Sequence, residues 1–191
     1  MEDSRRRGRR TLLILAAIFL LPVAVSFALY YGKLWRPAGS ASKGELIDPR
    51  PLLAGSLRSP DGKPADQAVF TGKWSLIYVG DGACNQDCRQ ALVFARQSRL
   101  ALNNEMTRVQ RVFLATANCC DTTYLAQEHA GLITLDASEA RALQAQFPGD
   151  QQHSLYIVDP LGNLMMRHDA AHTSKGLLTD LKKLLKLSHI G

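Results

Sequence analysis

Two cysteines, Cys84 and Cys88, are the residues of this sequence best suited to chemistry. They follow an apolar run and the glycine-rich turn Gly80-Asp81-Gly82, and a segment of helical character begins near the second cysteine. Residues four apart on a helix lie on one face about one turn apart, and a helix N-terminus favours a thiolate. This placement predicts a pair that is redox-active or binds a metal. A structural disulfide, or two cysteines that only pack, is the alternative.

A second pair, Cys119 and Cys120, follows an apolar segment at residues 109–115 that is typical of a strand. Neighbouring parallel strands end at the same edge of a sheet, so both cysteine pairs are predicted at one edge. There Cys119 or Cys120 is a resolving thiol or an auxiliary soft ligand. The alternatives are that the two pack as small apolar residues or form a vicinal disulfide. We expect them near the first pair without being required for its function.

Among the histidines, only His153 has an informative position, directly before a third strand-like segment. Taken alone, it is a loop histidine. His168 and His172 have an i, i+4 spacing, but they lie between a predicted strand and a predicted helix and no glutamate accompanies them. A second metal site there is therefore the weaker hypothesis. We expect His129 and His189 on the surface.

The elements that position these residues are predicted from apolar periodicity and turn signals. A small hairpin is expected from residues 52–57 and 68–70 around a turn at residues 59–63. The predicted order requires a parallel strand pair and ends in a hairpin and a helix, which gives an α/β sandwich with a mixed central sheet, the order of a thioredoxin-like fold. The predicted strands are 74–79, 109–115, 132–135, 155–158 and 164–167, and the predicted helices 89–103, 121–129, 138–147 and 174–187.

An N-terminal transmembrane helix is predicted before this domain. Residues 11–31 are a run of 21 residues without a charge, preceded by five arginines. As a helix this run spans about 30 Å, the thickness of a bilayer core. A cleaved signal peptide is the alternative, but the run is longer than such peptides use. The predicted parts are a basic cytoplasmic tail (1–10), a transmembrane anchor (11–34), a linker (35–46) and a thioredoxin-like domain (47–191).

The net charge of +6 belongs mostly to the flanks of the membrane segment, because the first 36 residues hold five of the six net positive charges. A nucleic-acid partner is therefore not expected. By the positive-inside rule, the arginines stay in the cytoplasm and the domain is exported. The predicted location is the inner (cytoplasmic) membrane, crossed once, with the domain in the periplasm. In that oxidising compartment a thiol pair stays reduced only if a reductant or a metal keeps it so.

Two stretches, GKWSLIYVGDGACNQDC and the later HSLYIVDPLGN, resemble the Sco/SenC family, the thioredoxin-like copper proteins of cytochrome c oxidase assembly. In that family a C-x-x-x-C motif and a distant histidine bind copper, and Cys84, Cys88 and His153 match those positions. The resemblance implies copper as cofactor and, as partner, an oxidase subunit that carries a copper site. Two thiolates and an imidazole are indeed a donor set suited to copper.

The sequence also departs from the family pattern. Family members commonly have proline after the first cysteine and often after the second, where this chain has Asn85 and Arg89. Their acidic loop after the second strand is replaced here by Asn118-Cys119-Cys120 and the residues that follow. The resemblance therefore predicts the fold more strongly than the metal affinity or the partner.

Three functions are consistent with the sequence. The first is a membrane-anchored, periplasm-facing Sco-like protein that assists assembly of a copper site of cytochrome c oxidase by copper transfer, thiol–disulfide exchange or both. The second is a metal-free thiol–disulfide oxidoreductase in which Cys84 attacks and Cys88 resolves. The third is a non-catalytic assembly scaffold with structural cysteines.

Overall fold

The structure, a computed structural model, describes residues 2–32, 42–53, 55–170, 174–188 and 190–191. It contains two separate units, an N-terminal helical segment and the compact unit Ser42–Gly191. Helix α1 (Glu2–Tyr31) includes Pro22 and is apolar from Thr11 onward. Its portion Arg6–Tyr31 is long and apolar enough to cross a membrane. This agrees with the transmembrane helix expected from the sequence.

The centre of the compact unit is a parallel group of three strands, β4 (Trp74–Gly80), β5 (Val109–Ala115) and β6 (Leu132–Asp136). Every residue of β4 is buried, which explains why the sequence reads as a continuous apolar run rather than an alternating one. Alternate residues of β4 feed opposite cores: Trp74, Leu76 and Tyr78 face one, and Ile77 and Val79 face the other. Because β4 and β5 run parallel, their carboxyl ends lie at the same edge of the sheet.

Antiparallel strands complete the sheet on both sides of this group. On one side lie β7 (Ser154–Val158), β8 (Asn163–Asp169) and β1 (Glu45–Pro51), and on the other the short hairpin β2 (Leu57–Arg58) and β3 (Pro64–Ala65). The strand order is β1-β8-β7-β4-β5-β6-β2-β3. The predicted α/β sandwich with a mixed sheet is confirmed.

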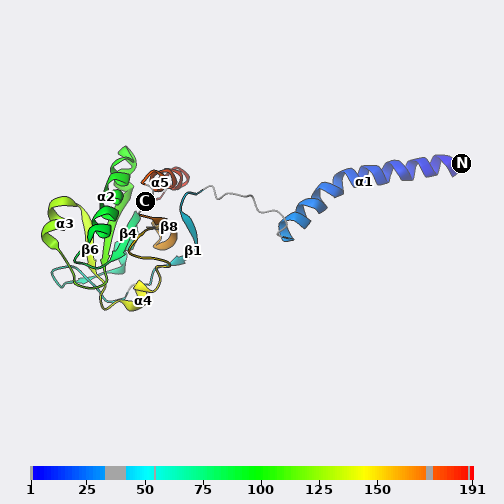
Figure 1. The fold of residues 1–191 in the computed structure, drawn as a ribbon. Helices are drawn as coiled ribbons and strands as arrows, with labels where there is room; N and C mark the ends of the chain where they lie inside the picture. The colour runs from blue at the N-terminus through cyan, green and yellow to red at the C-terminus, as the bar shows by residue number, and fades with distance from the viewer. Residues whose placement is uncertain (1, 33–41, 54, 171–173, 189) are drawn as a thin grey trace. The chain divides into compact units, whose positions relative to one another are not determined.

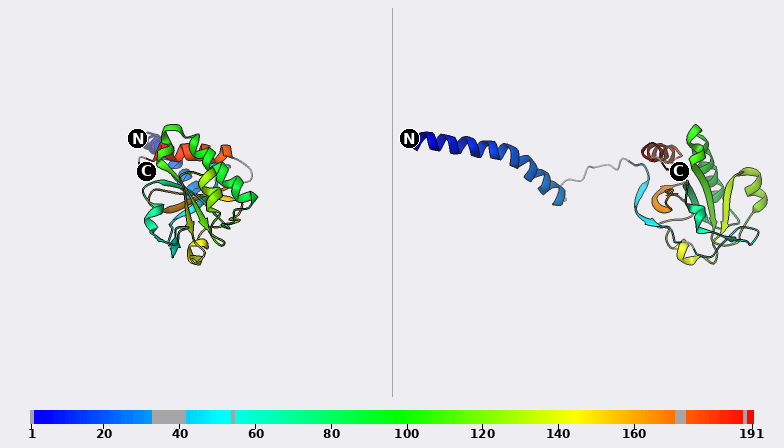
Figure 2. Two further views of the ribbon diagram at one scale, coloured as in Figure 1. Left: turned by 90° about the vertical axis from the view of Figure 1, so that its left-hand side faces the viewer. Right: turned by 180° about the vertical axis from the view of Figure 1, so that it is seen from behind.

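Helices cover the two faces of the sheet unequally (Figures 1 and 2). Helices α2 (Gln86–Leu100), α3 (Thr122–Glu128) and α5 (Ser174–Leu187) contribute apolar side chains to one core, which also contains Cys84 and Cys88. The other core receives η1 (Gln67–Phe70) and α4 (Arg141–Gln144). A second 3-10 segment, η2 (Asn103–Arg108), leads into β5.

Three local predictions differ from the structure. Residues 68–70 belong to the 3-10 turn η1 rather than to a strand, because Asp66 caps that turn by accepting from the Ala68 amide. Helix α4 is shorter than the predicted 138–147, and no side chain caps it, so Ser138 does not begin it. No strand was predicted for residues 45–51, where the predicted linker meets the domain, but they form β1 beside β8.

Candidate functional site

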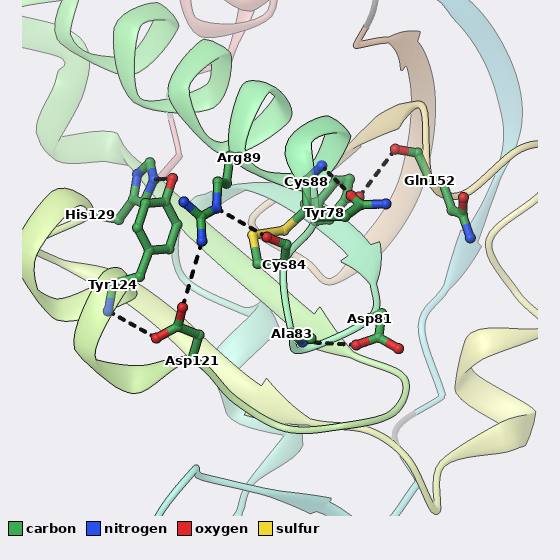
Figure 3. Close-up of a disulfide and its surroundings, with 11 residues drawn as sticks. Tyr78, Asp81, Ala83, Cys84, Cys88, Arg89, Asp121, Tyr124, His129 and Gln152 are labelled. Carbon is green, nitrogen blue, oxygen red and sulfur yellow. Dashed lines mark hydrogen bonds and ion pairs between the residues drawn. A yellow bond between two sulfur atoms is a disulfide. The ribbon is translucent and has the colours of Figure 1, made fainter.

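Cys84 lies in the turn between β4 and α2, and Cys88 lies in the first turn of α2; the two cysteines form a disulfide with their Cα atoms 5.1 Å apart (Figure 3). Asp81 shapes the turn by accepting from the Ala83 amide at 2.8 Å. Asn85 then caps α2 by accepting from the Cys88 amide at 3.0 Å. Cys84 itself has a φ of 48°, in the left-handed region that few side chains adopt. Both cysteines are 1% exposed, so the disulfide is shielded from solvent.

Tyr78 lies in the same apolar cluster as the disulfide and connects it to the chain that enters β7. Its hydroxyl donates to the Gln152 carbonyl at 3.1 Å. Burial raises the pKa of Tyr78 to about 12, and the negative charges of Asp87 and Asp150 add to this effect. Gly80 leaves room for the ring, because a Cβ there would lie 2.8 Å from it. The phenol therefore stays protonated and holds the loop before His153 in place.

His153 directly precedes β7, and its side chain approaches the first turn of α2. Its Nδ1 is 2.8 Å from an Asp150 carboxylate oxygen, and its Nε2 is 3.5 Å from an oxygen of Asp87, the residue before Cys88. The hydrogen bond with Asp150 raises the pKa of His153, and the charges of Asp150 and Asp87 act in the same direction. A small hollow beside the imidazole is lined by Asp87, Gln90 and Gln152. The imidazole is half exposed, in contrast to the buried sulfurs.

Cys119 and Cys120 form a vicinal disulfide in the loop after β5. This was one of the alternatives that the sequence left open. The loop is joined to the β4–α2 turn by two backbone hydrogen bonds, from Gly82 N–H to the Ala117 carbonyl at 2.8 Å and from Asp121 N–H to the Gly82 carbonyl at 3.0 Å. The expectation that the second cysteine pair lies beside the first is therefore confirmed.

The opposite flank of the first disulfide is formed by Arg89, Asp121, Tyr124 and His129 (Figure 3). Arg89 Nε donates to the Cys84 carbonyl at 3.2 Å, its guanidinium is 3.8 Å from an Asp121 oxygen, and it stacks on the Tyr124 ring at 4.3 Å. None of these residues was predicted from the sequence to belong to the site. Their roles depend on the pairing of β4 with β5, and the sequence carries no local signal of that contact.

The prediction that His129 lies on the surface is wrong, because this residue is 1% exposed. Its Nε2 is 3.0 Å from the Tyr124 hydroxyl oxygen. Burial lowers the pKa of His129, and the nearby charges of Arg111 and Arg96 lower it further. His129 is thus a neutral residue of the core beneath α3. His189, expected on the surface as well, lies outside the described residues.

His168 is buried as well, with Nε2 3.4 Å from an oxygen of Asp180. The same carboxylate oxygen accepts from the Lys43 and Gly44 amides at 2.6 and 2.9 Å. These contacts fasten the start of the compact unit to β8 and α5, which gives His168 a structural role. His172, its partner in the weaker metal-site hypothesis, lies outside the described residues.

The residues that the resemblance assigns to copper fit that ion by chemistry only in the reduced state. Thiolates are the soft ligands that copper prefers, and the disulfide offers none. Within the described ranges, no group of three His, Cys, Asp or Glu side chains is arranged to hold a metal ion. Cys88 is next to Asp87 in the chain and His153 contacts the Asp87 carboxylate, so the residues that the resemblance assigns to copper lie near the start of α2.

Comparison with known proteins agrees with this architecture. The family model described as "Transmembrane-like, thioredoxin-like, C-terminal domain" matches residues 74–188, and the one described as "Transmembrane-like, N-terminal domain" matches residues 2–33. No curated protein matches the chain.

Solved structures with the same fold include Sco proteins. Copper-bound yeast Sco1 is 18% identical with a TM-score of 0.60, over 78% of this chain and 96% of its own. Apo Sco1 from Thermus thermophilus is 21% identical with a TM-score of 0.59, over 77% and 99%. A thiol:disulfide interchange protein from Bacteroides sp. is 14% identical with a TM-score of 0.55, over 74% and 91%. The predicted thioredoxin-like fold and the resemblance to Sco/SenC proteins are thereby confirmed at the level of fold.

Proposed function

The chain belongs to the family of transmembrane-like, thioredoxin-like proteins, and from this premise we propose that it is a membrane-anchored, Sco-like redox protein that binds copper when reduced. Cys84, Cys88 and His153 are the proposed ligands. The proposed role is to assist assembly of a copper site, such as that of a cytochrome c oxidase subunit, by copper transfer or thiol–disulfide exchange. Helix α1 is the proposed anchor, with the arginines in the cytoplasm and the domain in the periplasm.

One observation carries the proposal: the disulfide and His153 converge on the first turn of α2. Asp87 is next to Cys88 in the chain and 3.5 Å from the His153 imidazole, although residues 88 and 153 lie far apart in sequence. A thiol–disulfide enzyme needs the cysteines alone. A half-exposed imidazole held against Asp87, the residue before Cys88, would add a nitrogen ligand, which a soft metal uses and a thiol–disulfide exchange does not need.

In this role each residue of the site has a separate task. A bound copper ion would supply a transferable metal centre held by two sulfurs and one nitrogen. Reduction of the disulfide frees the thiols, and the N-terminus of α2 stabilises the Cys88 thiolate. Asp150 orients the His153 ring through Nδ1 and leaves Nε2 as the nitrogen nearest to α2. Metal binding is then coupled to loss of the imidazole proton and of both thiol protons.

The second candidate is a metal-free thiol–disulfide oxidoreductase, and the observation that favours it is the disulfide itself. In this function Cys84 is the attacking thiol and Cys88 the resolving thiol. The fold is also that of the thiol:disulfide interchange protein from Bacteroides sp.. The two candidates differ in whether His153 matters, because the exchange reaction does not use it.

The test is a titration of the full chain in detergent micelles, fully reduced and free of oxygen, with Cu(I). We expect one copper per chain, and His153→Ala should weaken binding at least tenfold because a nitrogen ligand is lost. Gln152→Ala is the matched control, since this neighbouring side chain is exposed and the hydrogen bonds given for the residue are made by its backbone.

Unchanged copper affinity in His153→Ala would remove that residue from the site. If the wild-type chain binds no copper but its Cys84–Cys88 pair reduces insulin, the metal-free oxidoreductase is correct. Failure of both measurements would leave the assembly scaffold with structural cysteines.

A further inference from the structure

The two disulfides of this domain lie in neighbouring loops, the β4–α2 turn and the loop after β5. We call the contact between these two loops the seam. Besides the two backbone hydrogen bonds through Gly82, the Asn118 side-chain amide donates to Asp81 at 2.8 Å. A Cβ on Gly82 would lie 2.7 Å from the Cys119 Cα and 2.6 Å from the Asn118 carbonyl oxygen. The backbones of the loops are therefore in direct contact, with no side chain between them at this point.

This contact brings Cys119 within reach of Cys84. Cys84 is two residues after Gly82, a distance of at most about 7 Å along the chain. All four cysteines belong to one apolar cluster, in which Cys84 and Cys88 are buried and Cys119 and Cys120 pack against it from the side. A disulfide needs Cα atoms within about 7 Å, so a closing movement of these two adjoining loops brings a sulfur of one pair to a sulfur of the other.

The two pairs differ in their access to solvent. Cys84 and Cys88 are 1% exposed, whereas Cys119 and Cys120 are partly exposed. A reductant in solution, above all a bulky one, therefore reaches the vicinal disulfide first. Thiol–disulfide exchange requires a direct approach of the attacking sulfur, so access determines which pair reacts.

Charge at the seam favours the same reaction. The Arg89 guanidinium lies between the loops, bonded to the Cys84 carbonyl on one side and 3.8 Å from Asp121, the residue after Cys120, on the other. A neighbouring cation favours the thiolate, which is the attacking form. Thiolates formed in either loop are thus close to a positive charge.

We propose that Cys119 and Cys120 are a second redox centre, through which an external dithiol reduces the buried Cys84–Cys88 disulfide. Cys119 is the attacking residue, because its Cα is the one that lies against Gly82. Cys120 is the resolving residue. The proposal builds on the redox activity of Cys84 and Cys88 in the proposed function and does not depend on copper.

The transfer conserves electrons and protons. The external dithiol first reduces the Cys119–Cys120 bond and becomes a disulfide. The Cys119 thiolate attacks the Cys84 sulfur, a Cys119–Cys84 bond forms, and Cys88 leaves as a thiolate at the N-terminus of α2. The Cys120 thiolate then attacks Cys119, which reforms the vicinal disulfide and releases the Cys84 thiolate. Two electrons have passed to Cys84 and Cys88, which take up two protons as thiols.

The first experiment follows reduction of the full chain in detergent micelles by dithiothreitol. Samples are quenched with iodoacetamide over time and digested with trypsin, which separates the pairs into peptides 74–89 and 112–141. We expect the double variant Cys119→Ser, Cys120→Ser to reduce Cys84–Cys88 at least tenfold more slowly than the wild type. Cys84→Ser, Cys88→Ser is the matched control, in which thiols of the vicinal pair should accumulate at least as fast as in the wild type, because no acceptor reoxidises them.

The second experiment traps the intermediate and needs no comparison of rates. The variant Cys88→Ser, Cys120→Ser keeps only Cys84 and Cys119, and mild oxidation with diamide should link peptides 74–89 and 112–141 within one chain. Equal reduction rates of Cys84–Cys88 in the wild type and in Cys119→Ser, Cys120→Ser, or absence of the linked peptides, would overturn the relay.

Copper binding separates failure of the relay from failure of the proposed function. Fully reduced Cys119→Ser, Cys120→Ser should bind copper as the wild type does, since its proposed ligands are intact. Normal copper binding with an unslowed reduction rejects the relay alone. Loss of copper binding in the reduced wild type rejects the proposed metal site and leaves the kinetic comparison valid.

Discussion

The two flanks of the Cys84–Cys88 disulfide are built from opposite chemistry. One flank is acidic and partly open, with His153 between Asp150 and Asp87. The other is basic, with a half-exposed Arg89 stacked on Tyr124 and with His129 buried behind it. A carboxylate flank favours a cation and a guanidinium flank favours a thiolate, so one sulfur pair lies between a side suited to metal and a side suited to thiol exchange.

The flanks also differ in how they are attached to the sheet. His153 precedes β7, which pairs antiparallel with β4. The residues that Arg89 contacts, Asp121 and Tyr124, follow β5, which pairs parallel with β4 over seven residues from Trp74–Val109 to Gly80–Ala115. On the parallel side the β4–α2 turn and the loop after β5 begin at the same edge of the sheet and contact each other through their backbones. On the antiparallel side each contact uses a side chain, from Tyr78 to the Gln152 carbonyl and between Asp87 and His153. We therefore expect substitutions at the parallel seam to affect stability and those beside His153 to affect mainly chemistry.

The largest effect is expected from Gly82→Ala, which breaks the seam. The new methyl group would lie within 3 Å of three backbone atoms of residues 117–119, and backbone cannot move aside as a side chain can. Overpacking of this kind costs about 1–3 kcal/mol of unfolding free energy. Urea unfolding of the full chain in micelles measures it, with Gly8→Ala as control because its methyl group meets nothing within 4 Å. Wild-type stability would mean that the loops separate freely.

A smaller effect is expected from Arg89→Gln, which removes the cation of the basic flank. The side chain is 52% exposed, so its ion pair and its stacking together contribute about 1 kcal/mol. Loss of the charge should also slow alkylation of reduced Cys84 and Cys88 at neutral pH severalfold, because the thiolate fraction falls. Arg96→Gln, two turns along α2 and bonded only to the Glu128 carbonyl, is the matched control. Equal alkylation rates in both variants would show that Arg89 does not act on the thiols.

Strongly patterned segments were predictable from the sequence. Strand β5 and helix α5 have the predicted bounds. A continuous apolar run of this length favours a buried strand, and a regular amphipathic repeat favours a helix. Strand β1 was missed because it contains two prolines and shows no buried alternation, with six of its seven residues exposed. Only its pairing with β8 makes it a strand.

The positions of the four cysteines could be predicted from the sequence, but the residues around them could not. The spacing of Cys84 and Cys88 indicated their shared turn, and strand order placed the second cysteine pair beside them. His129 was misplaced, since the neighbouring charge of Glu128 and the nearby Gly131 suggest a surface loop, whereas its burial follows from packing beneath α3. The approach of Asp87 to His153 depends on the register of β7 against β4, which no local pattern encodes.

The smallest effect is a pH shift that tests the acidic flank. Asp150 raises the pKa of His153 through a hydrogen bond, and Asp87 acts more weakly in the same direction. A metal needs the neutral imidazole, so protons compete with copper up to a higher pH than at an ordinary histidine. Asp150→Asn removes the largest cause, the pKa falls, and the lower pH limit of copper binding should move down.

The same titration in Asp87→Asn sharpens this expectation. Its shift should have the same sign and be smaller, because Asp87 is 3.5 Å from Nε2 and Asp150 is 2.8 Å from Nδ1. Asp61→Asn, an exposed carboxylate that pairs with Lys63, should leave the pH limit unchanged. Copper titrations of the reduced full chain at several pH values measure all three variants. A shift to higher pH in Asp150→Asn would mean that Asp150 orients the ring for the metal more than it holds the proton, and the two flanks would then differ in geometry rather than in charge.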